Sequence, residues 1–141
     1  MVEHLKRNAR ALGLPFGDRT MTYNSRLAQE LGVWAQEKGN GRRFHDAAFK
    51  SYFVDGENLA QNDILLAIAE KAGLDRGEAE LVLSSRSHAA KVDRDWEQAE
   101  KLGITAVPTF VIDRDMLVGA QEYRSLAAFV TKHGAHKMND L

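Results

Sequence analysis

The chain has 141 residues, of which 44% are hydrophobic and 28% are charged, and its formal net charge is −1 at pH 7. This composition is typical of a folded soluble protein and excludes a disordered one. The nineteen basic and twenty acidic residues are interleaved, so we expect neither a nucleic-acid partner nor a membrane partner. Cysteine is absent, which excludes disulfides, zinc–thiolate sites and thiol catalysis by this chain's own side chains.

The first fourteen residues alternate charges with isolated apolar side chains, unlike the unbroken apolar stretch of a signal peptide. We therefore expect a cytoplasmic protein.

Apolar residues at helical spacing predict a mainly helical first part. The expected helices span residues 2–12, 24–39, 42–54, 62–73, 75–85 and 87–102. Asp75 and Glu78 have the spacing of a capping box at the start of the fifth. Aromatic residues gather in the second and third helices, and we expect them in the core (Trp34, Phe44, Phe49, Tyr52 and Phe53). The sixth is expected to bury Ala89, Val92, Trp96, Ala99 and Leu102.

After Gly103 the pattern changes to that of a β-hairpin. Residues 109–112 (TFVI) have the β-branched and aromatic content of a strand, residues 113–115 form a turn, and residues 116–118 form a second strand. A last helix, carrying Tyr123, Leu126, Ala127, Phe129 and Val130, runs to about His133. Residues 134–141 are expected to be a frayed tail.

Four stretches in this order resemble the DsbA family of thioredoxin-fold thiol-disulfide oxidoreductases, and within it the FrnE-like branch. They are NSRLAQELGVWAQEKG, FHDAAFKSYFVDGENLAQNDILLAIAEKAGLD, EQAEKLGITAVPTFVID and VGAQ. The resemblance implies an incomplete thioredoxin-like fold. Residues 1–102 would be the family's inserted helical subdomain, and residues 103–133 the C-terminal β-β-α part of the thioredoxin core.

In the family, the peptide bond matching Val107-Pro108 is cis, which for a proline costs only about 0.5–1 kcal/mol. The resemblance implies that the backbone of Val107 pairs with an extended substrate, a protein or peptide thiol or disulfide. It further implies that Pro108 shields the reactive sulfur and that Thr109 continues the loop. These three are the expected substrate-binding residues.

The family's C-x-x-C motif has no counterpart among these residues. We expect the front half of the thioredoxin core to be missing, whether the chain is a domain of a longer protein, the product of a misassigned start or a naturally shortened relative. No catalytic residue is assigned, and the chain alone is expected to be inactive in disulfide exchange. Because its partner strands would be gone, we expect the hairpin, with its apolar residues Phe110, Ile112 and Leu117, to form a homodimer.

Two other functions remain open. The related kappa-class glutathione transferases and hydroxychromene-carboxylate isomerases also carry a helical insertion and a VP-type loop, so a glutathione-dependent isomerase or transferase is the enzymatic alternative. A non-catalytic binding or dimerisation module is the other.

No cofactor and no metal site is expected. His133 and His136 lie in or near the frayed tail without an acidic pair beside them in sequence. His4, His45 and His88 are interpreted as surface or capping groups, and Asp93, Asp95 and Glu97 as a solvated charged face.

Overall fold

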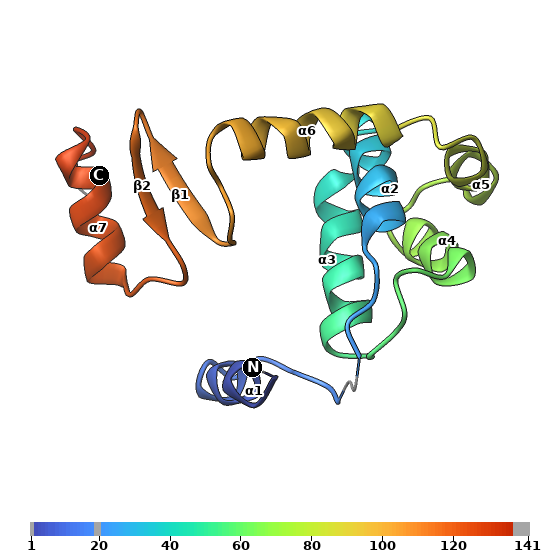
Figure 1. Cartoon of the computed structure of the whole chain (residues 1–141). Coiled ribbons are helices and arrows are strands. Elements are labelled where there is room, and N and C mark those ends of the chain that lie inside the picture. The colour runs from blue at the N-terminus through green and yellow to red at the C-terminus, as the bar shows by residue number, and fades with distance from the viewer. Residues whose placement is uncertain (1, 19–20, 137–141) are drawn as a thin grey trace, which may run out of the picture. The chain divides into compact units, whose positions relative to one another are not determined.

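A computed structural model describes residues 2–18 and 21–136 (Figure 1). Its elements are α1 (Val2–Ala11), α2 (Arg26–Glu37), α3 (Gly41–Phe53), α4 (Asn62–Lys71), α5 (Arg76–Ser85), α6 (Ala89–Lys101), β1 (Thr109–Ile112), β2 (Asp115–Val118) and α7 (Tyr123–Lys132). The mainly helical fold with a single hairpin is the one the sequence predicts. The chain divides into two compact units, residues 1–94 and residues 95–141, and the division falls within α6.

The first unit has a core built by α2, α3, α4 and α5, which pack against one another (Figure 1). Helix α4 contributes most to it, because its sequence NDILLAIAEK is apolar on more than one side. The fully buried side chains of this core include Leu31, Leu65, Ile68, Ala69 and Ala79.

Two local signals fix the ends of α5. Asp75 Oδ1 accepts a hydrogen bond of 2.8 Å from the backbone N–H of Glu78, which confirms the predicted helix cap. Arg86 ends the helix in the left-handed conformation with φ 53°, a geometry that is uncommon for a residue with a Cβ.

The aromatic residues of α3 only partly enter the core. Phe44 of α3 and Trp34 of α2 are buried, as predicted. The expectation for Phe49 is wrong: it is 49% exposed, and its ring lies 4.1 Å from the ring of His45, centroid to centroid. The ring of Phe49 also lies 5.3 Å from that of Phe53. Tyr52 is partly buried and packs against the core.

The second unit contains a two-stranded antiparallel sheet of β1 and β2 (Figure 1). In this sheet Thr109 pairs with Val118 and Ile112 with Asp115. None of the residues 95–136 is buried. The expected burial of Trp96 and Leu102 in α6 is therefore wrong, since they are 53% and 45% exposed. The described residues of this unit therefore form no buried core. A hairpin needs such a core, because an isolated pair of strands is only marginally stable.

The tail expected at residues 134–141 is described only as far as His136, and residues 137–141 lie outside the described part of the chain. Among the helices in the described ranges, none is both long enough and apolar enough to cross a membrane.

Candidate functional site

The candidate site is the loop between α6 and β1, residues 102–108. It begins where Gly103, with φ 72°, ends α6 and the N–H of Ile104 turns back to the carbonyl of Ala99 at 2.9 Å. A positive φ of this kind favours glycine, which explains the helix stop that the sequence shows.

Two hydrogen bonds fix the far end of the loop. The N–H of Gly119, just after β2, donates to the carbonyl of Pro108 at 2.8 Å. The hydroxyl of Thr109 donates to the carbonyl of Ala106 at 2.7 Å. The peptide bond between Val107 and Pro108 is cis. Pro108 and Thr109 are thus held between β2 and the loop itself.

Val107 stands out in this loop. Val107 is 89% exposed, which is the highest exposure among the large hydrophobic residues described. Within residues 2–18 and 21–136, its backbone N–H and C=O have no hydrogen-bond partner. Both groups are therefore available to an extended polypeptide laid alongside.

No side chain of the loop can supply redox chemistry. Thiol-disulfide exchange needs a thiolate, and the chain contains no cysteine. A cluster of three or more metal-ligating side chains is also not found in the part of the chain that the structure describes. The loop therefore has no nucleophilic sulfur of its own.

The end of α7 is tied to the turn of the hairpin by charges that the sequence reasoning missed. His133 Nδ1 lies 3.5 Å from Asp113, and its Nε2 lies 3.2 Å from Asp115 without the alignment of a hydrogen bond. Lys132 also binds Asp115, and this hydrogen bond is the main cause that lowers the pKa of Asp115. No acidic pair lies beside His133 in the sequence, and it is the fold that brings both carboxylates to it.

In the first unit, two residues that the sequence analysis assigned to the surface, His88 and Asp93, make specific contacts. His88 Nε2 lies 3.0 Å from Glu37 and its Nδ1 lies 2.9 Å from the hydroxyl of Ser87. The hydrogen bond to His88 is the main cause that lowers the pKa of Glu37. Asp93 is not merely solvated, since it accepts an ion pair of 2.6 Å from Arg26.

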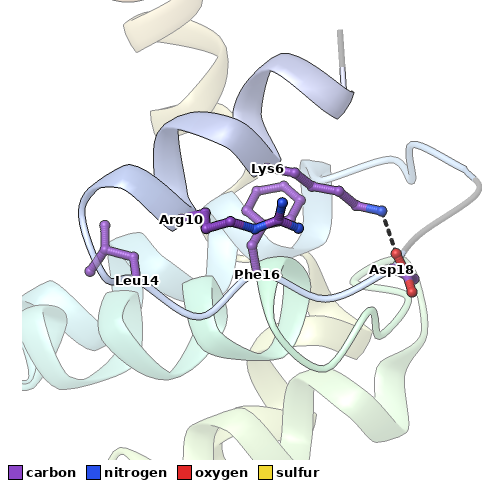
Figure 2. Close-up of a pocket in the computed structure, with 5 residues that line it drawn as sticks. All are labelled: Lys6, Arg10, Leu14, Phe16 and Asp18. Carbon is purple, nitrogen blue, oxygen red and sulfur yellow. Dashed lines mark hydrogen bonds and ion pairs between the residues drawn. The ribbon is translucent and has the colours of Figure 1, made fainter.

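A cavity of about 300 Å³ lies beside α1, lined by Lys6, Arg10, Leu14, Phe16 and Asp18 (Figure 2). The amino group of Lys6 is already engaged, because it binds Asp18 (Figure 2). It also lies 3.5 Å from a carboxylate oxygen of Glu3. We assign no ligand to this cavity.

A protein-family model, the DSBA-like thioredoxin domain, matches residues 1–131. The chain belongs to this family. This match confirms the resemblance to DsbA proteins found in the sequence. A solved structure of a probable DsbA oxidoreductase from Streptomyces coelicolor matches the chain with a TM-score of 0.85 and 29% identity. The structural match confirms the predicted DsbA-like fold.

Individual relatives are longer than this chain. The Streptomyces match covers 99% of this chain but 62% of that protein. The uncharacterised protein YwbO of Bacillus subtilis is 33% identical over 95 residues, which are 67% of this chain and 48% of YwbO. The ClpXP adapter protein SpxH of Halalkalibacterium halodurans is 32% identical over 75 residues, which are 53% of this chain and 24% of SpxH. The chain thus spans about half the length of YwbO, the more similar of these two curated relatives.

Proposed function

We propose that the loop at residues 102–108, together with Thr109, is the substrate-binding half of a DsbA-type thiol-disulfide exchange site. In this proposal the backbone of Val107 pairs with an extended protein or peptide that carries a thiol or disulfide. Pro108 shields the reacting sulfur, and Thr109 orders the loop. The observation that carries the proposal is the exposed Val107, whose backbone N–H and C=O have no partner within the described residues.

The chemistry of exchange then requires a thiolate from outside these 141 residues. A thiolate attacks one sulfur of a disulfide, a new sulfur–sulfur bond forms, and the other sulfur leaves as a thiolate, so no external oxidant is consumed in the step. Because the chain has no cysteine, it binds such a substrate but does not itself exchange with it.

The finer assignments rest on the sequence motifs. The order and spacing of the four motifs support the FrnE-like branch of the family, and residues 1–102 as its inserted helical subdomain. The hairpin, in a unit where none of the residues 95–136 is buried, supports a homodimer formed through β1 and β2.

The peptide-binding proposal is tested by nuclear magnetic resonance of the full chain. An extended peptide with a single cysteine is added to the ¹⁵N-labelled protein, and the amides of Val107 and Thr109 are expected to shift while those of α4 stay in place. Val107→Pro, which removes the N–H, should weaken binding about tenfold, the equivalent of one lost backbone hydrogen bond of about 1.4 kcal/mol.

Val118→Thr is the matched control, because Val118 is an exposed valine of the same hairpin. It should leave the binding unchanged. Equal loss of affinity in both variants, or insulin reduction by the cysteine-free chain, would contradict the proposal.

A further inference from the structure

The peptide group between Val118 and Gly119, at the end of β2, is hydrogen-bonded at both of its ends. Its N–H donates a hydrogen bond of 2.8 Å to the carbonyl of Pro108. Its carbonyl accepts a hydrogen bond of 2.7 Å from the side-chain amide of Gln121. The N–H and C=O of a planar trans peptide point in opposite directions, so Pro108 and Gln121 hold the same peptide plane from two sides.

The partner strand does not bind the carbonyl of Val118. In an antiparallel pair, residues that exchange hydrogen bonds alternate with residues whose N–H and C=O point away from the partner strand. Gly119 binds Pro108, so the next pair, Thr109 and Val118, exchanges no hydrogen bonds. Gln121 therefore supplies a donor to a carbonyl that points away from β1.

Glycine at position 119 gives this peptide group a second possible orientation. A peptide plane turns over as a unit when ψ of the residue before it and φ of the residue after it change together. Gly119 has φ 89°, and glycine populates positive and negative φ about equally. A half-turn would break both hydrogen bonds and point the carbonyl of Val118 at that of Pro108. The bond from Gln121 favours the orientation in which Gly119 binds Pro108.

The orientation of this peptide matters for the candidate site because Pro108 directly follows Val107. The carbonyls on either side of the Val107 carbonyl are both held. The carbonyl of Ala106 accepts a side-chain hydroxyl at 2.7 Å, and the carbonyl of Pro108 accepts the N–H of Gly119. The backbone of Val107 thus lies between two fixed neighbours, one of which depends on the peptide that Gln121 binds.

We propose that Gln121 is a positioning residue of the candidate site. By binding the carbonyl of Val118, it locks the peptide whose N–H holds Pro108. The backbone of Val107 is then ordered before an extended substrate arrives, which lowers the entropy cost of binding. Gln121 is itself held in place, because the next residue, Glu122, accepts the first hydrogen bonds of α7. This inference rests on the substrate-binding role proposed above and adds to it a residue outside the loop.

Gln121→Met removes the side-chain N–H and keeps a side chain of similar length. Nuclear magnetic resonance of the peptide-free protein measures the scalar coupling across the hydrogen bond from Gly119 to Pro108, and this coupling should be lost in the variant. The coupling between Phe110 and Leu117, the next hydrogen-bonded pair of the hairpin, should remain. Loss of both couplings would mean that the whole hairpin has loosened and would contradict a local role of Gln121.

Peptide affinity shows whether the locked peptide matters for binding. Gln121→Met should weaken binding of the extended cysteine peptide about fivefold, within the range of one hydrogen bond. The matched control is Gln29→Met in α2, because the side-chain amide of Gln29 also donates, at 3.0 Å to the hydroxyl of Ser25. This control should leave the affinity unchanged. Val118→Thr is expected to do the same, because only backbone atoms of Val118 take part.

A double variant tells a positioning role from an independent defect. Gly119→Ala disfavours the φ of 89°, because a Cβ strains it, and should break the same hydrogen bond to Pro108. If Gln121 acts only through that bond, adding Gln121→Met to Gly119→Ala should weaken peptide binding no further. Independent effects would multiply instead, and such multiplication would overturn the proposal.

The outcomes keep the two proposals apart. A wild-type chain that binds no peptide contradicts the substrate-binding role of Val107, while the coupling from Gly119 to Pro108 in the peptide-free protein still supports or overturns the lock by Gln121. Where the wild type does bind, an unchanged coupling or an unchanged affinity in Gln121→Met overturns the positioning role and leaves the substrate-binding role standing.

Discussion

Arg86 binds both carboxylate oxygens of Glu30 across 56 residues of chain: its Nε lies 2.7 Å from Oε2, and its Nη2 lies 2.6 Å from Oε1. Arg26 adds a third contact, with its Nε 2.7 Å from Glu30 Oε1. The Glu30 side chain is only 1% exposed, so its charge is buried with both partners in place. The left-handed turn at Arg86 therefore joins the end of α5 to α2 through a fully paired ion network.

Acid should destabilise the helical unit through Glu30. The hydrogen bonds from Arg86, and then those from Arg26, lower the pKa of Glu30 from 4.5 to about 2. A carboxyl whose pKa is depressed in the folded state stabilises that state above its unfolded pKa. This stabilisation, about 3 kcal/mol, should be present above about pH 4.5 and be lost as the pH falls towards 2.

Urea unfolding followed by circular dichroism at several pH values between 7 and 2 measures this loss. In Glu30→Gln, which has no charge to titrate, the free energy of unfolding should fall less steeply in the same range. An identical acid dependence in both proteins would rule out Glu30 as the cause.

Removing Arg86 should cost far more than removing an exposed arginine. Arg86→Ala leaves the buried carboxylate with Arg26 alone, and we expect the free energy of unfolding to fall by about 2 kcal/mol. The control is Arg76→Ala, because Arg76 binds Glu70 at 2.8 Å while both side chains are about half exposed. That variant should lose less than about 1 kcal/mol. Equal losses by chemical denaturation would mean that burial of Glu30 contributes nothing.

How far the sequence predicts this structure depends on the distance over which a signal acts. The cap at Asp75 and the turn at residues 113–114 are local, because a side chain or a loop recognises its own neighbours in the chain. The Glu30 network is not, since nothing near Glu30 in the sequence identifies Arg86. The predicted burial of Trp96 and Leu102 was wrong for a related reason: helical spacing tells which residues share a face, but not whether anything covers that face.

The same limit applies to the candidate site. The proline of residues 103–113 and the following strand identified the loop from sequence alone, through a resemblance that the family match confirms. The contacts that fix this loop, from Gly119 to Pro108 and from Gln121 to Val118, depend on the hairpin register. Only the VGAQ motif gave a signal for them, without indicating what its glutamine does.

Gly119→Ala should loosen the loop that holds Pro108. Gly119 has φ 89°, which strains any residue with a Cβ by about 1–2 kcal/mol, and its N–H is the donor to Pro108. Amide hydrogen exchange in β1 and β2 should become faster, and peptide binding at Val107 should weaken. Gly32→Ala provides the contrast: Gly32 lies inside α2, where a Cβ would be 3.6 Å from the Phe44 ring, and the change should stabilise the protein by about 0.5–1 kcal/mol. Faster hairpin exchange in Gly32→Ala would argue against a local effect at Gly119.

Leu65→Ala should destabilise the first unit without affecting the second. Leu65 is fully buried among α2, α3, α4 and α5, and losing its side chain leaves a cavity that costs about 2–5 kcal/mol. Leu81→Ala is the matched control, since Leu81 of α5 is 69% exposed and its truncation should change the free energy of unfolding by less than about 0.5 kcal/mol. Hydrogen exchange in Leu65→Ala should accelerate throughout α2–α5 and remain unchanged in β1 and β2, because the two units have separate internal contacts. Equal acceleration in the hairpin would show that the chain unfolds as one cooperative unit.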